Sequence, residues 1–152
     1  MPRSHRGSLP PGASVPAELF VDTSGWYTLA LSSAAGHDAA QKALRERVKK
    51  RARIVTSNLV VAETHVLLLR RSGRRAALAF LREVGRGPNI VVTSSPDHEQ
   101  RALTDWLERF DDQPFSFTDA VSFAIMKERG IREALATDHH FAAAGFVVVP
   151  AP

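Results

Sequence analysis

Short apolar runs alternate with helical patterns along this chain, and that alternation constrains the fold more than any other feature. The runs typical of strands lie at residues 19–23, 53–57, 89–94, 133–138 and 146–149. Helical patterns occupy residues 24–32, 37–50, 58–71, 74–84, 95–110 and 115–130, with a short helical turn at 139–145. Strands separated by helices need crossover connections, which make neighbouring strands parallel. The sequence therefore predicts an α/β sheet with helices on both faces.

The length and composition fit one domain. The chain has 152 residues, of which 44% are hydrophobic and 24% charged, as in soluble globular proteins. Residues 1–17 are rich in Pro, Gly and Ser and lack the apolar core of a signal peptide, so we expect a disordered N-terminal extension before a domain at residues 18–150. No apolar stretch approaches the ~20 residues of a membrane span. The absence of cysteine excludes disulfides and thiolate sites, and is compatible with the cytoplasmic location that we expect.

Basic residues slightly outnumber acidic ones, 20 to 16, and gather in two runs. The first run comprises Arg45, Arg47, Lys49, Lys50, Arg51 and Arg53, and the second comprises Arg70, Arg71, Arg74 and Arg75. Such runs are typical of solvated helix faces and helix C-termini. They are also typical of surfaces that contact phosphates. The sequence leaves both interpretations open.

Two acids stand where strands end. Asp22 directly follows the apolar run Leu19–Val21, and Asp138 closes the run "EALATD". In open parallel sheets, ligands bind beyond the carboxyl ends of the strands. Both carboxylates are therefore expected at the functional edge of the sheet.

Two further acids interrupt helical patterns. Glu63 has Leu59, Val60, Val66 and Leu67 three and four residues away, which predicts a place within an apolar stripe. Asp119 forms a capping-box pattern with Ser116 and also has apolar residues one turn away on either side. Each acid has an ordinary explanation alone, as a rim glutamate or as a helix cap.

Together the four acids indicate a metal site. Asp22, Glu63, Asp119 and Asp138 follow strands or lie near the starts of helices that leave the same edge of the sheet. Carboxylates brought together raise one another's pKa values, and a divalent cation removes that penalty. Mg²⁺ and Mn²⁺ prefer such hard oxygen ligands, so the sequence predicts Mg²⁺ (or Mn²⁺) as cofactor.

Four sequence blocks carry a family resemblance. "FVDTSGW", "NLVVAET", "SFTDAVSFAIMKERGI" and "LATDHHFAAAGF" resemble, in order and approximate spacing, the motifs of PIN-domain nucleases. The closest likeness is to VapC-type toxins of type II toxin–antitoxin pairs, and it covers about residues 19–149. It implies a three-layer fold around a mostly parallel sheet, and a divalent-metal-dependent endoribonuclease.

The resemblance also implies roles and partners. The family's acidic quartet falls on Asp22, Glu63, Asp119 and Asp138, as metal-binding and catalytic residues. One or two of the neighbouring hydroxyl residues are expected to orient carboxylates or waters, and the candidates are Thr23, Ser116, Thr118 and Thr137. The expected partners are an RNA substrate such as tRNA or rRNA, a small cognate antitoxin and a second copy of the chain in a homodimer, with no membrane.

The sequence is also compatible with other functions. A PIN-fold nuclease of RNA maturation, a DNA-directed nuclease of the same fold, or a non-catalytic module that binds RNA or a protein would share most of these features. A phosphatase with a strand-end Asp nucleophile usually has a second Asp two residues on, where this chain has Ser24. His139 and His140 adjoin Asp138, and we expect a structural role for them rather than contact with substrate.

Overall fold

The computed structural model describes residues 15–152, so most of the extension predicted at residues 1–17 lies outside the described part. Residues 15–17 lead into the first strand without regular secondary structure, and the carbonyl of Ala17 accepts a hydrogen bond from the Arg53 backbone N–H at 2.9 Å. The boundary between extension and domain stays a prediction.

The sheet has five strands in the order β3-β2-β1-β4-β5. The strands are β1 (Glu18–Val21), β2 (Arg53–Ser57), β3 (Ile90–Val92), β4 (Glu133–Leu135) and β5 (Val147–Val149). Every pair of neighbouring strands is parallel, as the helical crossovers require. The predicted α/β class and parallel sheet are therefore confirmed.

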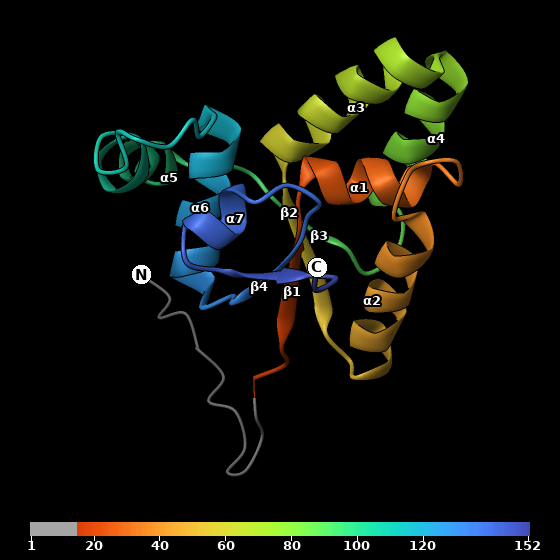
Figure 1. Ribbon diagram of the computed structural model, residues 1–152, viewed down its shortest axis with the longest axis horizontal. Coiled ribbons are helices and arrows are strands. Elements are labelled where there is room, and N and C mark those ends of the chain that lie inside the picture. The colour runs from red at the N-terminus through yellow and green to blue at the C-terminus, as the bar shows by residue number, and fades with distance from the viewer. Residues whose placement is uncertain (1–14) are drawn as a thin grey trace, which may run out of the picture.

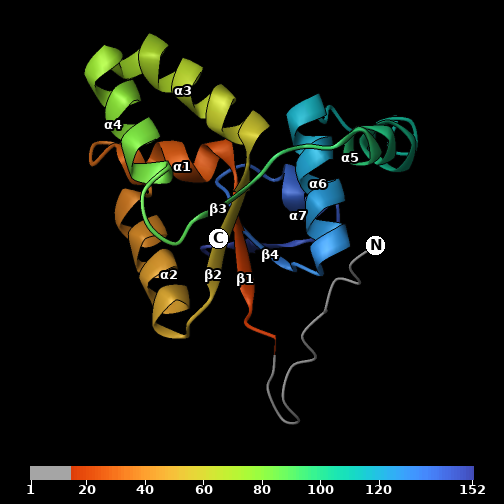
Figure 2. The ribbon, with the colours of Figure 1, turned by 180° about the vertical axis from the view of Figure 1, so that it is seen from behind.

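Helices cover both faces of the sheet (Figures 1 and 2). One layer contains α1 (Thr23–Ala30), α2 (His37–Lys49), α3 (Asn58–Ser72) and α4 (Arg74–Val84). The other contains α5 (Pro96–Arg101), a π-helix (Ala102–Leu107), α6 (Phe117–Arg129) and α7 (His140–Ala143). The three layers agree with the prediction. Within residues 15–152, no helix combines the length and apolar character needed to cross a membrane.

The core is built around the central strand β1. Leu19, Phe20 and Val21 are fully buried because β1 lies between β2 and β4 and is covered on both faces. On the α6 side, Phe123 packs edge-on against Phe141, with ring centroids 4.9 Å apart. The residue that follows β1, Asp22, therefore lies inside the molecule rather than at its surface.

Several predicted boundaries need correction. The first helix begins at Thr23 with Asp22 as its N-cap. Ser57, not Asn58, caps α3, while the Asn58 side chain accepts a hydrogen bond from the Ser94 backbone N–H. β4 ends at Leu135, three residues before Asp138. The helix predicted at residues 95–110 changes to a π-helix at Ala102, a register that local sequence does not signal.

Gly25 sets how closely α1 approaches β4. A Cβ atom at this position would lie 2.3 Å from the carbonyl oxygen of Leu135 and 2.6 Å from its Cδ2. The first atom belongs to the backbone of a buried strand and cannot move aside. A glycine is therefore required where the first helix crosses the sheet.

We predict that Gly25→Ala destabilises the fold by about 1–3 kcal/mol, the usual cost of overpacking. The measurement is thermal unfolding followed by circular dichroism, with the exposed-turn substitution Ser32→Ala as control. An unchanged melting temperature in Gly25→Ala would contradict the close packing of α1 on β4.

Candidate active site

The four predicted acids lie around one depression at the carboxyl end of the sheet. Its volume is about 290 Å³. The lining residues are Asp22, Thr23, Ser24, Glu63, Leu67, Pro114, Ser116, Asp119, Asp138 and His140. Segments more than a hundred residues apart in the chain therefore meet here, as the parallel topology predicts.

Asp22 is the most buried of the four acids. Its side chain is the N-cap of α1, where Oδ2 accepts hydrogen bonds from the Ser24 backbone N–H at 3.5 Å and the Ser24 hydroxyl at 3.1 Å. The residue is only 2% exposed, and its other oxygen, Oδ1, is buried without a hydrogen-bond partner. A buried carboxylate oxygen without a donor is costly and points to a missing cationic or hydrogen-bonding partner.

The environment of Asp22 favours its protonated form. Burial is the main cause that raises the pKa of this carboxyl from 3.8 to about 7, and the nearby carboxylates Asp119 and Asp138 contribute to the rise. The backbone N–H of Thr23 and the hydroxyl of Ser24 lower the pKa but do not offset the burial. The ionised carboxylate is therefore destabilised unless positive charge enters the depression.

His140 connects Asp119 with Asp138. The Asp119 Oδ2 atom lies 2.9 Å from His140 Nδ1 and accepts a hydrogen bond from the Ser116 backbone N–H at 3.1 Å. The His140 backbone N–H in turn donates to Asp138 Oδ1 at 3.1 Å. His140 thus contacts both acids, and its structural role stays a prediction.

Each of the three aspartates is held through one oxygen only. The described hydrogen bonds engage Oδ2 of Asp22, Oδ2 of Asp119 and Oδ1 of Asp138. The second oxygen of each carboxylate takes part in none of them. The fold thus orients these side chains and leaves one oxygen on each without a hydrogen bond among residues 15–152.

The predicted position of Glu63 within an apolar stripe is wrong. Glu63 is exposed, because α3 buries the face formed by Val60, Thr64 and Leu68 instead. Of the four apolar residues read as that stripe, only Val60 lies on the buried face. Glu63 nevertheless borders the depression, next to Leu67, so the exposed side chain can reach it by rotation.

The predicted hydroxyl residues divide into two groups. Thr23 and Ser116 line the depression, and the buried Thr23 hydroxyl has no hydrogen-bond partner. Thr118 and Thr137 are not among the lining residues. Ser24 was not predicted as a positioning residue, although it lies only two residues after Asp22 in the sequence. Its hydroxyl also accepts a hydrogen bond from the Thr137 backbone N–H at 3.0 Å.

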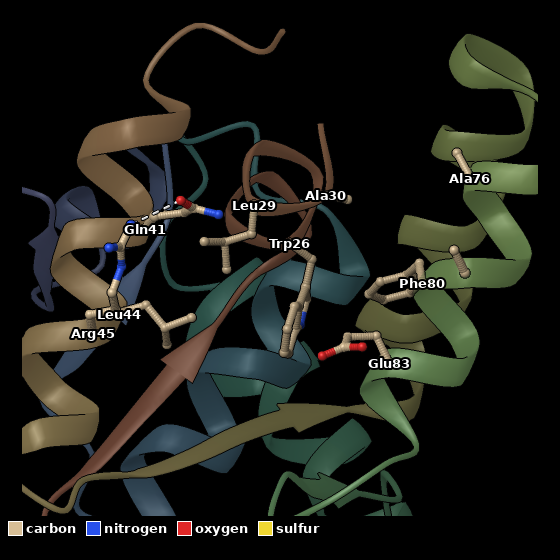
Figure 3. A pocket seen from close by; sticks show the side chains of 10 residues that line it. Trp26, Leu29, Ala30, Gln41, Leu44, Arg45, Ala76, Phe80 and Glu83 are labelled. Atoms are coloured by element: carbon tan, nitrogen blue, oxygen red, sulfur yellow. Dashed lines mark hydrogen bonds between the residues drawn. The ribbon is translucent and has the colours of Figure 1, made fainter. Parts of the chain in front are cut away.

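A second, larger hollow has a different character. It is about 460 Å³ in volume and lies among α1, α2 and α4. Figure 3 shows Trp26, Leu29, Leu44 and Phe80 around it, with a hydrogen bond from Arg45 to Gln41 at its rim. Glu83 is its single carboxylate, so it does not offer the clustered oxygens that hydrolysis of a phosphodiester needs.

Comparison with known proteins identifies the family. Residues 19–147 match the PIN domain. The chain belongs to the PIN-domain family. It is 42% identical over 135 residues to the 23S rRNA-specific endonuclease VapC20 of Mycobacterium tuberculosis, in strains CDC 1551 / Oshkosh and H37Rv alike, covering 86% of this chain and 97% of that protein.

A solved structure supports the same assignment. The chain superposes on the crystal structure of Mycobacterium tuberculosis VapC20, described as a sarcin–ricin loop cleaving toxin, with a TM-score of 0.78 and 40% identity. The overlap covers 86% of this chain and 97% of that one. The predicted VapC-type PIN-domain endoribonuclease is thereby confirmed, and the PIN fold with it.

The donors of this PIN-domain site suit a divalent cation in chemistry and location. The lining acids supply hard oxygens, and the unpartnered Oδ1 of Asp22 faces no other donor. As the side chains stand, no group of three or more His, Asp or Glu residues within residues 15–152 is close enough together to hold a metal ion. Binding would therefore require rotation of the exposed Glu63 and the half-buried Asp138 toward Asp22.

We predict that Asp22→Asn stabilises the metal-free protein at alkaline pH. The folded-state pKa of Asp22 is raised, so ionisation lowers stability as the pH rises from 3.8 to about 7, and above that the loss is complete. An amide avoids this loss and can still cap α1. The gain is up to about 4 kcal/mol at pH 8 and less than half as much at pH 5.

Thermal unfolding in the presence of a chelator, at pH 5 and pH 8, measures this difference. Asp38→Asn, which removes an exposed carboxylate from the first turn of α2, serves as the control. The same stability difference between wild type and Asp22→Asn at both pH values would show that Asp22 does not titrate in this range.

Proposed function

We propose that this chain is a Mg²⁺- or Mn²⁺-dependent ribonuclease toxin that cleaves 23S rRNA in the sarcin–ricin loop. The observation that carries the proposal is the 42% identity to VapC20, which extends over 97% of that protein's length. A shared substrate is supported when the likeness includes nearly the whole relative and not the catalytic motifs alone. Of the two expected substrates, this favours rRNA over tRNA.

We propose Asp22, Glu63, Asp119 and Asp138 as the metal-binding and catalytic residues. Support comes from their common depression and from the unpaired Asp22 oxygen. A divalent cation bound there would neutralise these carboxylates and supply positive charge to the scissile phosphate and an attacking water. No histidine or lysine is then required as a general base.

The protein's own residues prepare this site. Ser24 and the start of α1 hold Asp22, while Ser116 and His140 hold Asp119, so little reorganisation of these carboxylates is needed when a ligand arrives. Thr23 offers a buried hydroxyl that can orient a carboxylate or a water. Leu67 and Pro114 give the depression an apolar border.

A cognate antitoxin is proposed as the regulatory partner. The resemblance to the toxins of toxin–antitoxin pairs and the relative's description as a toxin support this. The chemistry of the depression suits an antitoxin segment that places Arg or Lys beside Asp22, Asp119 and Asp138. Homodimer formation and the cytoplasmic location stay predictions.

We predict that Asp22→Asn, Glu63→Gln and Asp119→Asn each lower the cleavage rate by at least about 100-fold and weaken Mn²⁺ binding, because each removes a charged ligand. Cleavage of rRNA is measured by gel, and Mn²⁺ binding by calorimetry or electron paramagnetic resonance. The matched controls, Asp38→Asn and Glu108→Gln, remove exposed carboxylates elsewhere. Full metal-dependent cleavage in Asp22→Asn would remove the proposed roles.

We predict one cut in the sarcin–ricin loop when purified bacterial ribosomes are incubated with the protein and Mg²⁺. Primer extension on 23S rRNA locates the cut, and it should disappear in chelator and in Asp22→Asn. Cleavage of tRNA with intact 23S rRNA would refute the proposed substrate but preserve the nuclease activity.

A further inference from the structure

The two basic runs of the sequence differ in the structure. In the first run, Arg47 forms an ion pair with Glu133 at 2.6 Å, and Arg53 with Glu18 at 3.4 Å. Arg45 donates to Gln41 at 3.0 Å. Three of its side chains are thus occupied by contacts within the fold.

The second run is differently placed. Arg70 lies near the end of α3, and Arg74 and Arg75 begin α4. All three are exposed, and none takes part in an ion pair or side-chain hydrogen bond among residues 15–152. Arg71 differs, since its guanidinium packs over the ring of Tyr27 at 5.7 Å. We call Arg70, Arg74 and Arg75 the arginine cluster.

The cluster continues the helix face that borders the acidic depression. Glu63 and Leu67 on α3 line the depression, and Arg70 follows at the next position on the same face. The rise of an α-helix places Arg70 about 10 Å beyond Glu63 along the axis. Figure 1 shows α3 extending away from the end of β2, with the turn into α4 at its far end. An RNA strand that follows this face from the acids would meet Arg70 within a few nucleotides.

Arg74 and Arg75 are not explained by the stability of α4. They occupy its first turn, where the helix dipole disfavours positive charge. The N-cap is Gly73, which supplies no side-chain hydrogen bond, and the first turn contains no acid. Arginines in the first turn of a helix, without a described acidic partner, suit a role in binding an anionic ligand.

We propose that the arginine cluster binds the phosphate backbone of the RNA next to the scissile site. The inference rests on the proposed function for its substrate, and assigns to this surface the phosphates that flank the acidic depression. Because the contacts are to phosphates, they contribute affinity and position rather than base specificity. The carboxylates alone repel RNA, so a basic surface beside them offsets that repulsion.

A protein partner is the competing occupant of this surface. Val66 and Leu69 on α3 are 42% and 43% exposed and could belong to an interface. Arg70, Arg74 and Arg75 make this surface strongly positive, and none of them has an acidic partner among residues 15–152. The charges therefore favour RNA.

The test compares two charge-matched variants in the inactive Asp22→Asn background. One carries Arg70→Gln, Arg74→Gln and Arg75→Gln. The control carries Arg45→Gln, Lys49→Gln and Lys50→Gln, which remove the same charge from exposed positions on α2 and its C-cap. Fluorescence anisotropy measures binding of a labelled sarcin–ricin stem-loop in Mg²⁺ at several salt concentrations, and light scattering measures the oligomeric state.

The cluster variant should bind at least about tenfold more weakly at low salt, with a slope of log affinity against log salt smaller by about 2. The control should keep the slope of Asp22→Asn. Equal slopes in the two variants, or a changed oligomeric state with unchanged RNA binding, would overturn the inference. The three Arg→Gln changes in the otherwise wild-type chain should raise KM with little effect on kcat.

Failure of the proposed function gives a different result. If wild type does not cleave the sarcin–ricin loop but the cluster variant still loses salt-dependent binding, the substrate is wrong and the binding surface stands. If wild type cleaves this loop and the cluster variant binds it as the control does, the binding surface is wrong and the nuclease assignment stands.

Discussion

The burial of Asp22 is the constraint on which the site depends. Its strand lies at the centre of the sheet, so the residue that ends the strand emerges inside the molecule. Capping α1 satisfies one carboxylate oxygen and leaves the other without a partner. Burial then raises the pKa of Asp22 to about 7. The protein thus holds a carboxyl group in a state that is unfavourable for the isolated chain but suited to a cationic ligand.

Structural and functional contacts share the same carboxyl groups. Asp119 completes a capping box with Ser116 through Oδ2, and that same oxygen contacts His140. One oxygen therefore serves the fold while the other can face a ligand. This explains why a capping interpretation and a metal-binding interpretation of Asp119 could both follow from the sequence: they are compatible roles of one side chain.

Local patterns predicted the fold and the acids that border the depression, and long-range contacts account for what the patterns missed. The strand run before Asp22 and the capping box at Asp119 are encoded within a few residues, so their positions could be read directly. The exposure of Glu63 depends on which face of α3 packs against α1. The apolar residues on either side of Glu63 form a broad stripe in the sequence, and the sequence does not show which part of that stripe is buried. The contact of His140 with Asp119 joins two elements twenty-one residues apart, and no periodicity indicates it.

The acids also differ in mobility, which shapes how a cation can bind. Asp22 and Asp119 are buried and held by helix caps, whereas Glu63 is exposed on α3 and unattached among the described contacts. The ordered pair needs no loss of side-chain entropy on binding, while Glu63 must lose its freedom when it closes on the ligand. A cation would therefore meet a prepared half-site first, and movement of Glu63 and Asp138 would complete it. Such an arrangement keeps the repulsion among the carboxylates low until the positive charge arrives.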